Sequence, residues 1–146
     1  MSGGAVLRSR VDPELAIDPA EVGRAVEELV PEALGVWVYG SFADGYARRD
    51  SDVDIAVLPD RALDAWDLHE RAATLAERLG REVDLVDLRR VGTVLRFEVA
   101  VRGVRVAARD PFACDLFETA AISMFQRLSE SQREHLAETR ARGSVA

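Results

Sequence analysis

The chain has 146 residues, of which 48% are hydrophobic, and it carries a formal net charge of −7. This length corresponds to one ordinary globular domain that can bury a core without disulfides or structural metals. The excess of acidic over basic residues, 26 against 19, disfavours a broad basic surface for the backbone of DNA or RNA.

Cysteine use and hydropathy indicate the cellular setting. Cys114 is the only cysteine, so an intrachain disulfide is excluded. No apolar run approaches the roughly 20 residues that a membrane span requires. The first residues, MSGGAVLRSRVDPEL, lack the hydrophobic stretch of a signal peptide. We therefore expect a reducing, cytoplasmic setting without a membrane partner.

The N-terminal part predicts a lead-in followed by a helix. Residues 1–17 show no sustained hydrophobic period, so we expect a loose lead-in before a single domain over residues 18–146. The segment IDPAEVGRAVEELVPEAL predicts a helix, with Asp18 as N-cap, Pro19 in the first turn and Glu21 closing a capping box. One helical stripe is apolar and is predicted to lie on a sheet: Val22, Ala25, Val26, Leu29 and Val30.

The middle of the chain predicts strands around a helix. Two β-rich runs, GVWVYGS and SDVDIAVLP, are separated by a turn-rich segment. A helix is predicted from about Arg61 to Leu79, with Asp60 available as N-cap and Gly80 as the stop. The run REVDLVDL follows as a third strand.

The remaining segments complete the predicted fold. The run VGTVLRFEVAVRGVRVAARD fits a helix by its apolar spacing and a hairpin by its β-branched content. We favour a helix to about Arg102, a strand from Val104 to Ala108, and a long helix opened by Asp110 and Pro111. The order predicts an α/β or α+β domain with helices packed on a small mixed sheet, whose strand order stays open.

Two aspartates interrupt an apolar strand. Asp52 and Asp54 stand at alternate positions, so both side chains project from one face while the residues between and after them point into the core. Buried carboxylates are costly unless a partner or a metal compensates their charge. Upstream, Gly40 permits close backbone approach, and Ser41 adds an amide and a hydroxyl that suit phosphate oxygens. This combination predicts a bound ligand.

A third carboxylate is available on the next strand. Hard cations such as Mg²⁺ take oxygen ligands, and nucleotidyl transfer uses such cations to bridge triphosphate oxygens. A carboxylate on a neighbouring strand can activate the attacking hydroxyl, and Asp84 is the candidate. Asp87 is the reserve, because it shares its face with Val83 and Leu85, which have the character of core positions.

The run GSFADGYARRDSDVDIAVL resembles the Gly-Ser and Asp-x-Asp motif of the DNA polymerase β-like nucleotidyltransferase superfamily. Within it, the run is most similar to the minimal nucleotidyltransferases (MNT), including those that act as antitoxins beside HEPN-domain toxins. The runs VDLVDL and LRFEVAVRGVRVAARDP and the terminal helix also look like an MNT chain, so the resemblance covers about residues 20–130. It implies the nucleotidyltransferase fold.

The resemblance also implies roles for individual residues. It implies that one or two Mg²⁺ ions bind to Asp52 and Asp54, and that Asp84 completes the metal site and acts as general base. It implies that ATP is the nucleotide donor. The residues expected to contact its phosphates are Gly40, Ser41 and Ser51, with Arg49 and the neighbouring Arg48 neutralising the leaving pyrophosphate.

The implied function is magnesium-dependent transfer of AMP from ATP to a hydroxyl, expected to be a tyrosine of a HEPN toxin, which makes the chain an antitoxin. Little sequence remains beyond the catalytic core, so we expect the site to be completed by another chain, either the toxin or a second copy. Two alternatives stay open. One is an antitoxin that neutralises its partner by binding alone, and the other is nucleotidyl transfer to a small molecule such as an aminoglycoside. No direct nucleic-acid partner is expected.

Overall fold

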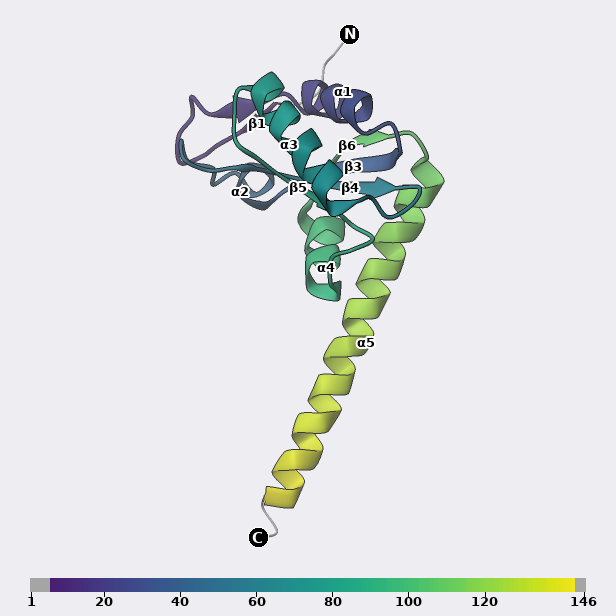
Figure 1. Cartoon of the computed structure of the whole chain (residues 1–146). Coiled ribbons are helices and arrows are strands. Elements are labelled where there is room, and N and C mark those ends of the chain that lie inside the picture. The colour runs from purple at the N-terminus through teal and green to yellow at the C-terminus, as the bar shows by residue number, and fades with distance from the viewer. Residues whose placement is uncertain (1–5, 144–146) are drawn as a thin grey trace.

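The computed structural model describes residues 6–143, in which helices and strands alternate along the chain (Figure 1). The order confirms the predicted mixture of helices and strands and adds two short N-terminal strands and one short helix. The elements are β1 (Leu7–Arg8), β2 (Ala16–Ile17), α1 (Pro19–Leu29), β3 (Ala33–Tyr39), α2 (Gly40–Asp44), β4 (Val53–Pro59), α3 (Ala65–Leu79), β5 (Val83–Asp87), α4 (Thr93–Arg102), β6 (Val104–Ala108) and α5 (Pro111–Gly143).

The main sheet has four strands in the order β5-β4-β3-β6. Strand β3 pairs antiparallel with both β4 and β6, whereas β4 and β5 pair in parallel. Helices α1 and α3 cover one face of this sheet, and α4 and the first part of α5 lie on the other (Figure 1). The predicted small mixed sheet with helices packed on it is confirmed.

Each face of the sheet has its own hydrophobic core. The α1 and α3 side buries β-branched residues of the central strands, such as Val36, Ile55 and Val57, against the apolar stripes of both helices. The opposite side packs Trp37, Tyr39, Ala56, Leu58 and Leu88 beneath α4 and α5. Because side chains alternate along a strand, Asp54 and Ala56 of β4 belong to this second face. That face also carries the acidic residues of interest.

The described part of the predicted lead-in is ordered, so the expectation of a loose segment is wrong for residues 7–17. Strands β1 and β2 pair antiparallel, with Leu7 opposite Ile17. Ser9 is buried, and its hydroxyl donates to the carbonyl of Ala47 at 2.5 Å. The same hydroxyl oxygen accepts the N–H groups of Val11 and Asp12, both at 3.1 Å. This long-range contact, which no local period reveals, ties the segment to the domain.

Helix boundaries follow their capping groups. Asp18 caps α1 as predicted and accepts the N–H of Ala20 at 3.0 Å, but the helix ends at Leu29, earlier than expected. The prediction of Asp60 as cap of α3 is wrong, because Asp64 caps this helix by accepting the N–H of Asp67 at 3.0 Å. The preceding loop is held away from helical geometry by the N–H of Leu63, which donates to the side chain of Asp87.

Helix α5 extends far beyond the domain (Figure 1). Its first part is anchored by buried Cys114 and Ala121, and Phe125 stacks on Phe97 with ring centroids 3.9 Å apart. From Glu130 to Gly143 every residue is exposed. Among the described residues, no helix combines the length and the apolar character that crossing a membrane requires.

Candidate active site

Three strands bring ionisable side chains together on one face of the sheet. Tyr39 on β3 is the register partner of Asp54 on β4, and Asp54 is the register partner of Asp84 on β5. Neighbouring strands lie about 4.8 Å apart, so one cation can reach both carboxylates. Asp52 precedes β4 with the same parity as Asp54. Asp52 and Asp84 are exposed, whereas Asp54 is half-buried.

This face has an excess of negative charge. Burial raises the pKa of Asp54 to about 6, and the charges of Asp84, Asp52 and Glu98 add to the increase in that order. Burial also raises the pKa of Tyr39, followed by the effects of Asp54, Asp84 and Glu98. Because like charges oppose one another's ionisation, a bound cation would stabilise the fully ionised carboxylates. The electrostatics therefore favour cation binding.

The donor set fits Mg²⁺ only in part. Carboxylate oxygens are the hard ligands that Mg²⁺ prefers, and it is commonly bound by one or two carboxylates together with substrate phosphates. Within residues 6–143, no group of three or more His, Cys, Asp or Glu side chains forms a metal-binding cluster by itself. Asp52, Asp54 and Asp84 thus suit an ion whose coordination is completed by a ligand.

Gly40 links this face to the following helix. Its φ of 69° lies in the left-handed region, where glycine avoids the strain of other residues. A Cβ at this position would collide with Oδ2 of Asp54. The backbone at the start of α2 therefore lies against the Asp54 carboxylate, and its expected contact with phosphate stays a prediction. Ser41 follows, and its carbonyl accepts the N–H of Tyr46 at 2.9 Å, which closes the short helix.

Two residues that the resemblance assigns to phosphate binding, Ser51 and Arg49, have partners of their own. The hydroxyl of Ser51 accepts the N–H of Arg48 at 2.8 Å and closes the turn that enters β4. The guanidinium of Arg49 lies 3.1 Å from the carboxylate of Asp12 and 3.5 Å from that of Glu14. The structure thus directs Arg49 toward the N-terminal strand pair. Phosphate contacts by Ser51 and Arg49 stay predictions.

Asp87 belongs to the opposite face. It is 2% exposed, and its carboxylate accepts the N–H of Leu63 at 2.9 Å and that of Arg89 at 2.8 Å. These contacts hold the loop after β4 and the turn after β5. Asp84, on the other face, is the residue that lies beside Asp54. The reserve candidate therefore has a structural role.

Glu98 is a member of this region that sequence reasoning missed. It lies on α4 and is half-buried, and its charge contributes to the raised pKa of Asp54, after burial and the two aspartates. The sequence offers one weak signal, a single carboxylate in the apolar run VLRFEVAV. Only the packing of α4 on the sheet turns that side chain toward the aspartates.

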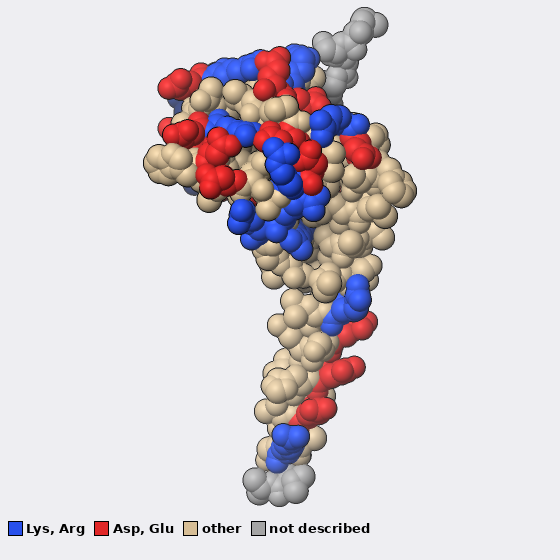
Figure 2. Space-filling model, turned by 45° about the vertical axis from the view of Figure 1, so that its right-hand side comes forward, with Lys and Arg blue, Asp and Glu red and all other residues tan. Residues whose placement is uncertain are grey.

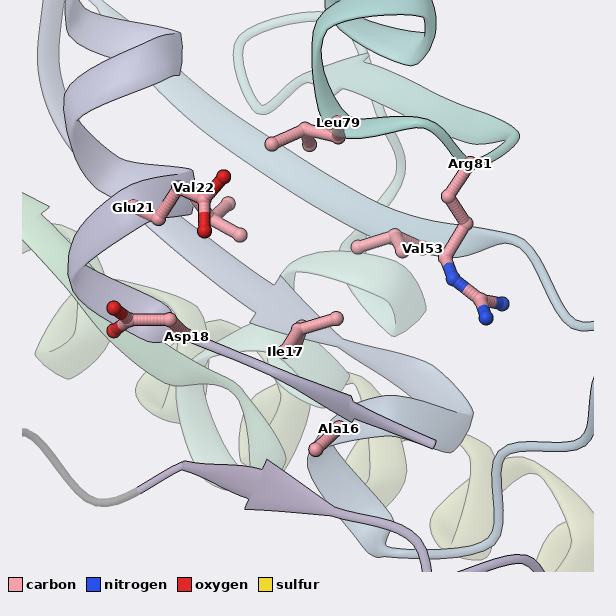
Figure 3. Close-up of a pocket in the computed structure, with 8 residues that line it drawn as sticks. All are labelled: Ala16, Ile17, Asp18, Glu21, Val22, Val53, Leu79 and Arg81. Atoms are coloured by element: carbon pink, nitrogen blue, oxygen red, sulfur yellow. The ribbon is translucent and has the colours of Figure 1, made fainter. Parts of the chain in front are cut away.

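A separate pocket of about 130 Å³ lies on the other face of the sheet (Figure 3). Val53, which points away from its neighbours Asp52 and Asp54, forms part of its lining. Two of its polar residues have structural partners: Asp18 caps α1, and Arg81 donates to the carbonyl of Ser51 at 3.2 Å. This pocket is therefore distinct from the acidic face.

Comparison with known proteins agrees with this geometry. Residues 26–112 match the family model described as "Polymerase beta, Nucleotidyltransferase". The protein adenylyltransferase MntA of Shewanella oneidensis is 34% identical over 110 residues, which cover 75% of this chain and 78% of that protein. The family-model match over residues 26–112 spans the strands that carry Asp54 and Asp84.

Solved structures that are similar to this chain in sequence also share its fold. One is a toxin-antitoxin with AMP-PNP, with a TM-score of 0.74 and 31% identity, covering 84% of this chain and 98% of that chain. Another is a tri-AMPylated Shewanella oneidensis HEPN toxin in complex with MNT antitoxin, with a TM-score of 0.67 and 29% identity, covering 83% of this chain and 94% of that chain. The predicted resemblance is confirmed, and this chain belongs to the polymerase β nucleotidyltransferase family.

Proposed function

We propose that this chain is a magnesium-dependent protein adenylyltransferase that transfers AMP from ATP to a tyrosine hydroxyl of a HEPN toxin and so acts as its antitoxin. The observation that carries the proposal is the register pairing of Asp54 with Asp84, with Asp52 on the same face. The similarity to a protein adenylyltransferase and to a complex with an AMPylated HEPN toxin supports the nucleotide and the acceptor. The same likeness favours a protein acceptor over a small molecule.

Each of these side chains has a separate role in the proposed reaction. Asp52 and Asp54 hold Mg²⁺, which when bound offsets negative charge on the triphosphate. Asp84 accepts the proton of the acceptor hydroxyl as its oxygen attacks the α-phosphorus of ATP in line. A new P–O bond forms, the bond to the β-phosphate oxygen breaks, and pyrophosphate leaves. The Gly40–Ser41 backbone, which lies against Asp54, is assigned to orienting the outer phosphates.

We also infer that the chain works in the cytoplasm. ATP is its proposed donor, and its lone cysteine is buried and forms no disulfide among the described residues. Disulfides are rare in reducing compartments, so the absence of a pairing partner in the sequence suits this location.

The direct test is intact-mass spectrometry of the HEPN partner after incubation with the chain, ATP and Mg²⁺. One or more AMP adducts are expected with the native chain and none with the Asp52→Asn/Asp54→Asn variant. Asp60→Asn/Glu77→Gln, which removes two exposed carboxylates after β4 and on α3, serves as a control of equal charge and should retain activity. An unmodified, active partner would overturn the transfer. Neutralisation that survives Asp52→Asn/Asp54→Asn would instead favour inhibition by binding alone.

A further inference from the structure

A groove lies where α4 and α5 meet the far end of the sheet. It consists of two hollows of about 340 and 110 Å³. Both are lined by Arg96 of α4 and Phe117 of α5, so they are parts of one depression. Leu58 and Leu88 form the sheet side of the larger hollow, and Leu116 lies on its α5 side. We refer to it as the Arg89–Arg96 groove.

The lining combines an apolar floor with two charges of the same sign. Arg89 and Arg96 are the only charged residues that line the two hollows. The Nε of Arg89 donates to the carbonyl of Pro59 at 2.6 Å, and the Nε of Arg96 to that of Leu88 at 2.9 Å. Neither guanidinium forms an ion pair with a carboxylate in the described part of the chain. A group of basic side chains borders the tan surface at the base of α5 (Figure 2).

The lining of this groove is basic although the net charge of the chain is −7. Some arginines of the domain pair with carboxylates, such as Arg71 with Glu32 at 2.7 Å and Arg105 with Glu118 at 2.9 Å, whereas the two guanidinium groups of the groove form no such pair within residues 6–143. Carbonyl partners fix the geometry of Arg89 and Arg96 but leave their positive charges uncompensated. The groove therefore suits a ligand that is apolar along one side and carries carboxylates.

The groove shares a face with the catalytic carboxylates but is remote from them. Leu58 lies on β4 four residues after Asp54, and Leu88 directly follows β5 four residues after Asp84, a distance of about 13 Å along the sheet. Alternation places all four side chains on the same side. A partner lying in the groove would thus face the surface that contains the proposed active site without occupying the nucleotide site.

We propose that the Arg89–Arg96 groove docks an acidic amphipathic helix of the protein that receives AMP, an inference that rests on the proposed function. Apolar side chains of that helix pack on Leu58, Leu88, Leu116 and Phe117, in the manner of helix-in-groove recognition. Its carboxylates pair with the two guanidinium groups, which favour bidentate contacts. A nucleic-acid backbone matches the charges but offers nothing apolar to cover the floor.

The test measures binding and transfer separately, with unmodified HEPN partner. Arg89→Glu/Arg96→Glu is expected to weaken binding in calorimetry by at least about tenfold and to raise KM for the partner, with kcat nearly unchanged. Leu116→Glu, at a position 54% exposed, should have the same effect without loss of folding. Arg24→Glu/Arg78→Glu, which changes net charge equally on α1 and α3, should bind as the native chain does. Circular dichroism of each variant reports folding.

Each outcome decides the inference. If folded Leu116→Glu and the arginine double variant bind the partner as the native chain does, the groove is rejected as the docking site. The proposed function is then unaffected. Binding of poly(U) RNA to the native chain alone, lost in Arg89→Glu/Arg96→Glu, overturns the choice of an acidic helix as ligand. Groove-dependent binding without AMP transfer supports the docking site but rejects the proposed chemistry. A native chain that neither binds nor modifies the partner rejects both.

Discussion

Asp54 and Asp84 are register partners on parallel strands β4 and β5, which places two carboxylates side by side at the spacing of adjacent strands. This pairing completes the acidic face, because it brings Asp84, which is distant in sequence, beside the aspartates of the motif. It also raises the pKa of Asp54, for which burial is the larger cause and Asp84 the next. The following predictions depend on this acidic face and on the contacts that support it.

Asp54→Asn is expected to lower AMP transfer at least about 100-fold, because the amide removes a cation-binding charge at the centre of the face. The measurement is the initial rate of adduct formation at saturating ATP and Mg²⁺. Asp60→Asn, an exposed carboxylate after β4, is the matched control. A variant that retains a tenth or more of the native rate would contradict a central role for Asp54.

The same substitution is expected to stabilise the chain in the absence of divalent cations. Because the folded-state pKa of Asp54 is raised from 3.8 to about 6, ionisation is less favourable in the folded than in the unfolded chain. The native protein therefore loses stability as the pH rises through this interval. After allowance for solvent screening, Asp54→Asn should raise the free energy of unfolding by about 1 kcal/mol at pH 7.5. Urea denaturation should show no gain near pH 3.5, and an equal gain at both pH values would reject this cause.

Gly40→Ala is expected to reduce both stability and activity. The positive φ of 69° strains any other residue, and the added Cβ would collide with the carboxylate of Asp54. The expected loss is about 1 to 3 kcal/mol in free energy of unfolding, together with a lower rate of transfer. Gly80→Ala separates the two effects, since Gly80 also has a positive φ but no atom within 4 Å of its added Cβ. This control should lose stability and keep its activity.

Glu98→Gln is expected to weaken activation by Mg²⁺. The charge of Glu98 adds to the negative potential around Asp54, so its removal should raise the Mg²⁺ concentration for half-maximal rate about threefold to fivefold. A magnesium titration of the transfer rate measures this effect. Glu77→Gln, exposed on α3, is the control. An unchanged magnesium requirement would show that Glu98 does not act on the cation.

Glu32→Gln is expected to lower the free energy of unfolding by about 1 to 2 kcal/mol at pH 7. Two hydrogen bonds join Glu32 to Arg71, at 2.7 and 2.9 Å, and they lower the pKa of Glu32 to about 2. Stability from this pair is complete above the ordinary pKa of 4.5 and is lost as the pH falls toward 2. The difference between native and variant in urea denaturation should shrink over that interval. Glu28→Gln, whose side chain is 62% exposed, should change stability little.

The sequence by itself determined which side chains of the Asp52–Asp54 strand share a face and where the first helix begins. Alternation assigned Asp52 and Asp54 to the face opposite Val53 and Ile55. The sequence likewise predicted Asp18 as the N-cap of α1. These features depend on residues that are neighbours along the chain, because strand alternation and helix capping are local. The family motif lies within the same local stretch, which is why the nucleotidyltransferase resemblance could be recognised.

Only the tertiary structure decided which residues from different elements meet. The parallel pairing of β4 with β5 set Asp84 beside Asp54, and the packing of α4 brought Glu98 toward them. The buried contact of Ser9 with Ala47 ordered the N-terminal strands, and Asp87 displaced the expected start of α3 through Leu63. Such contacts join residues far apart in sequence, so their partners follow from the packing of the whole domain and not from any local period.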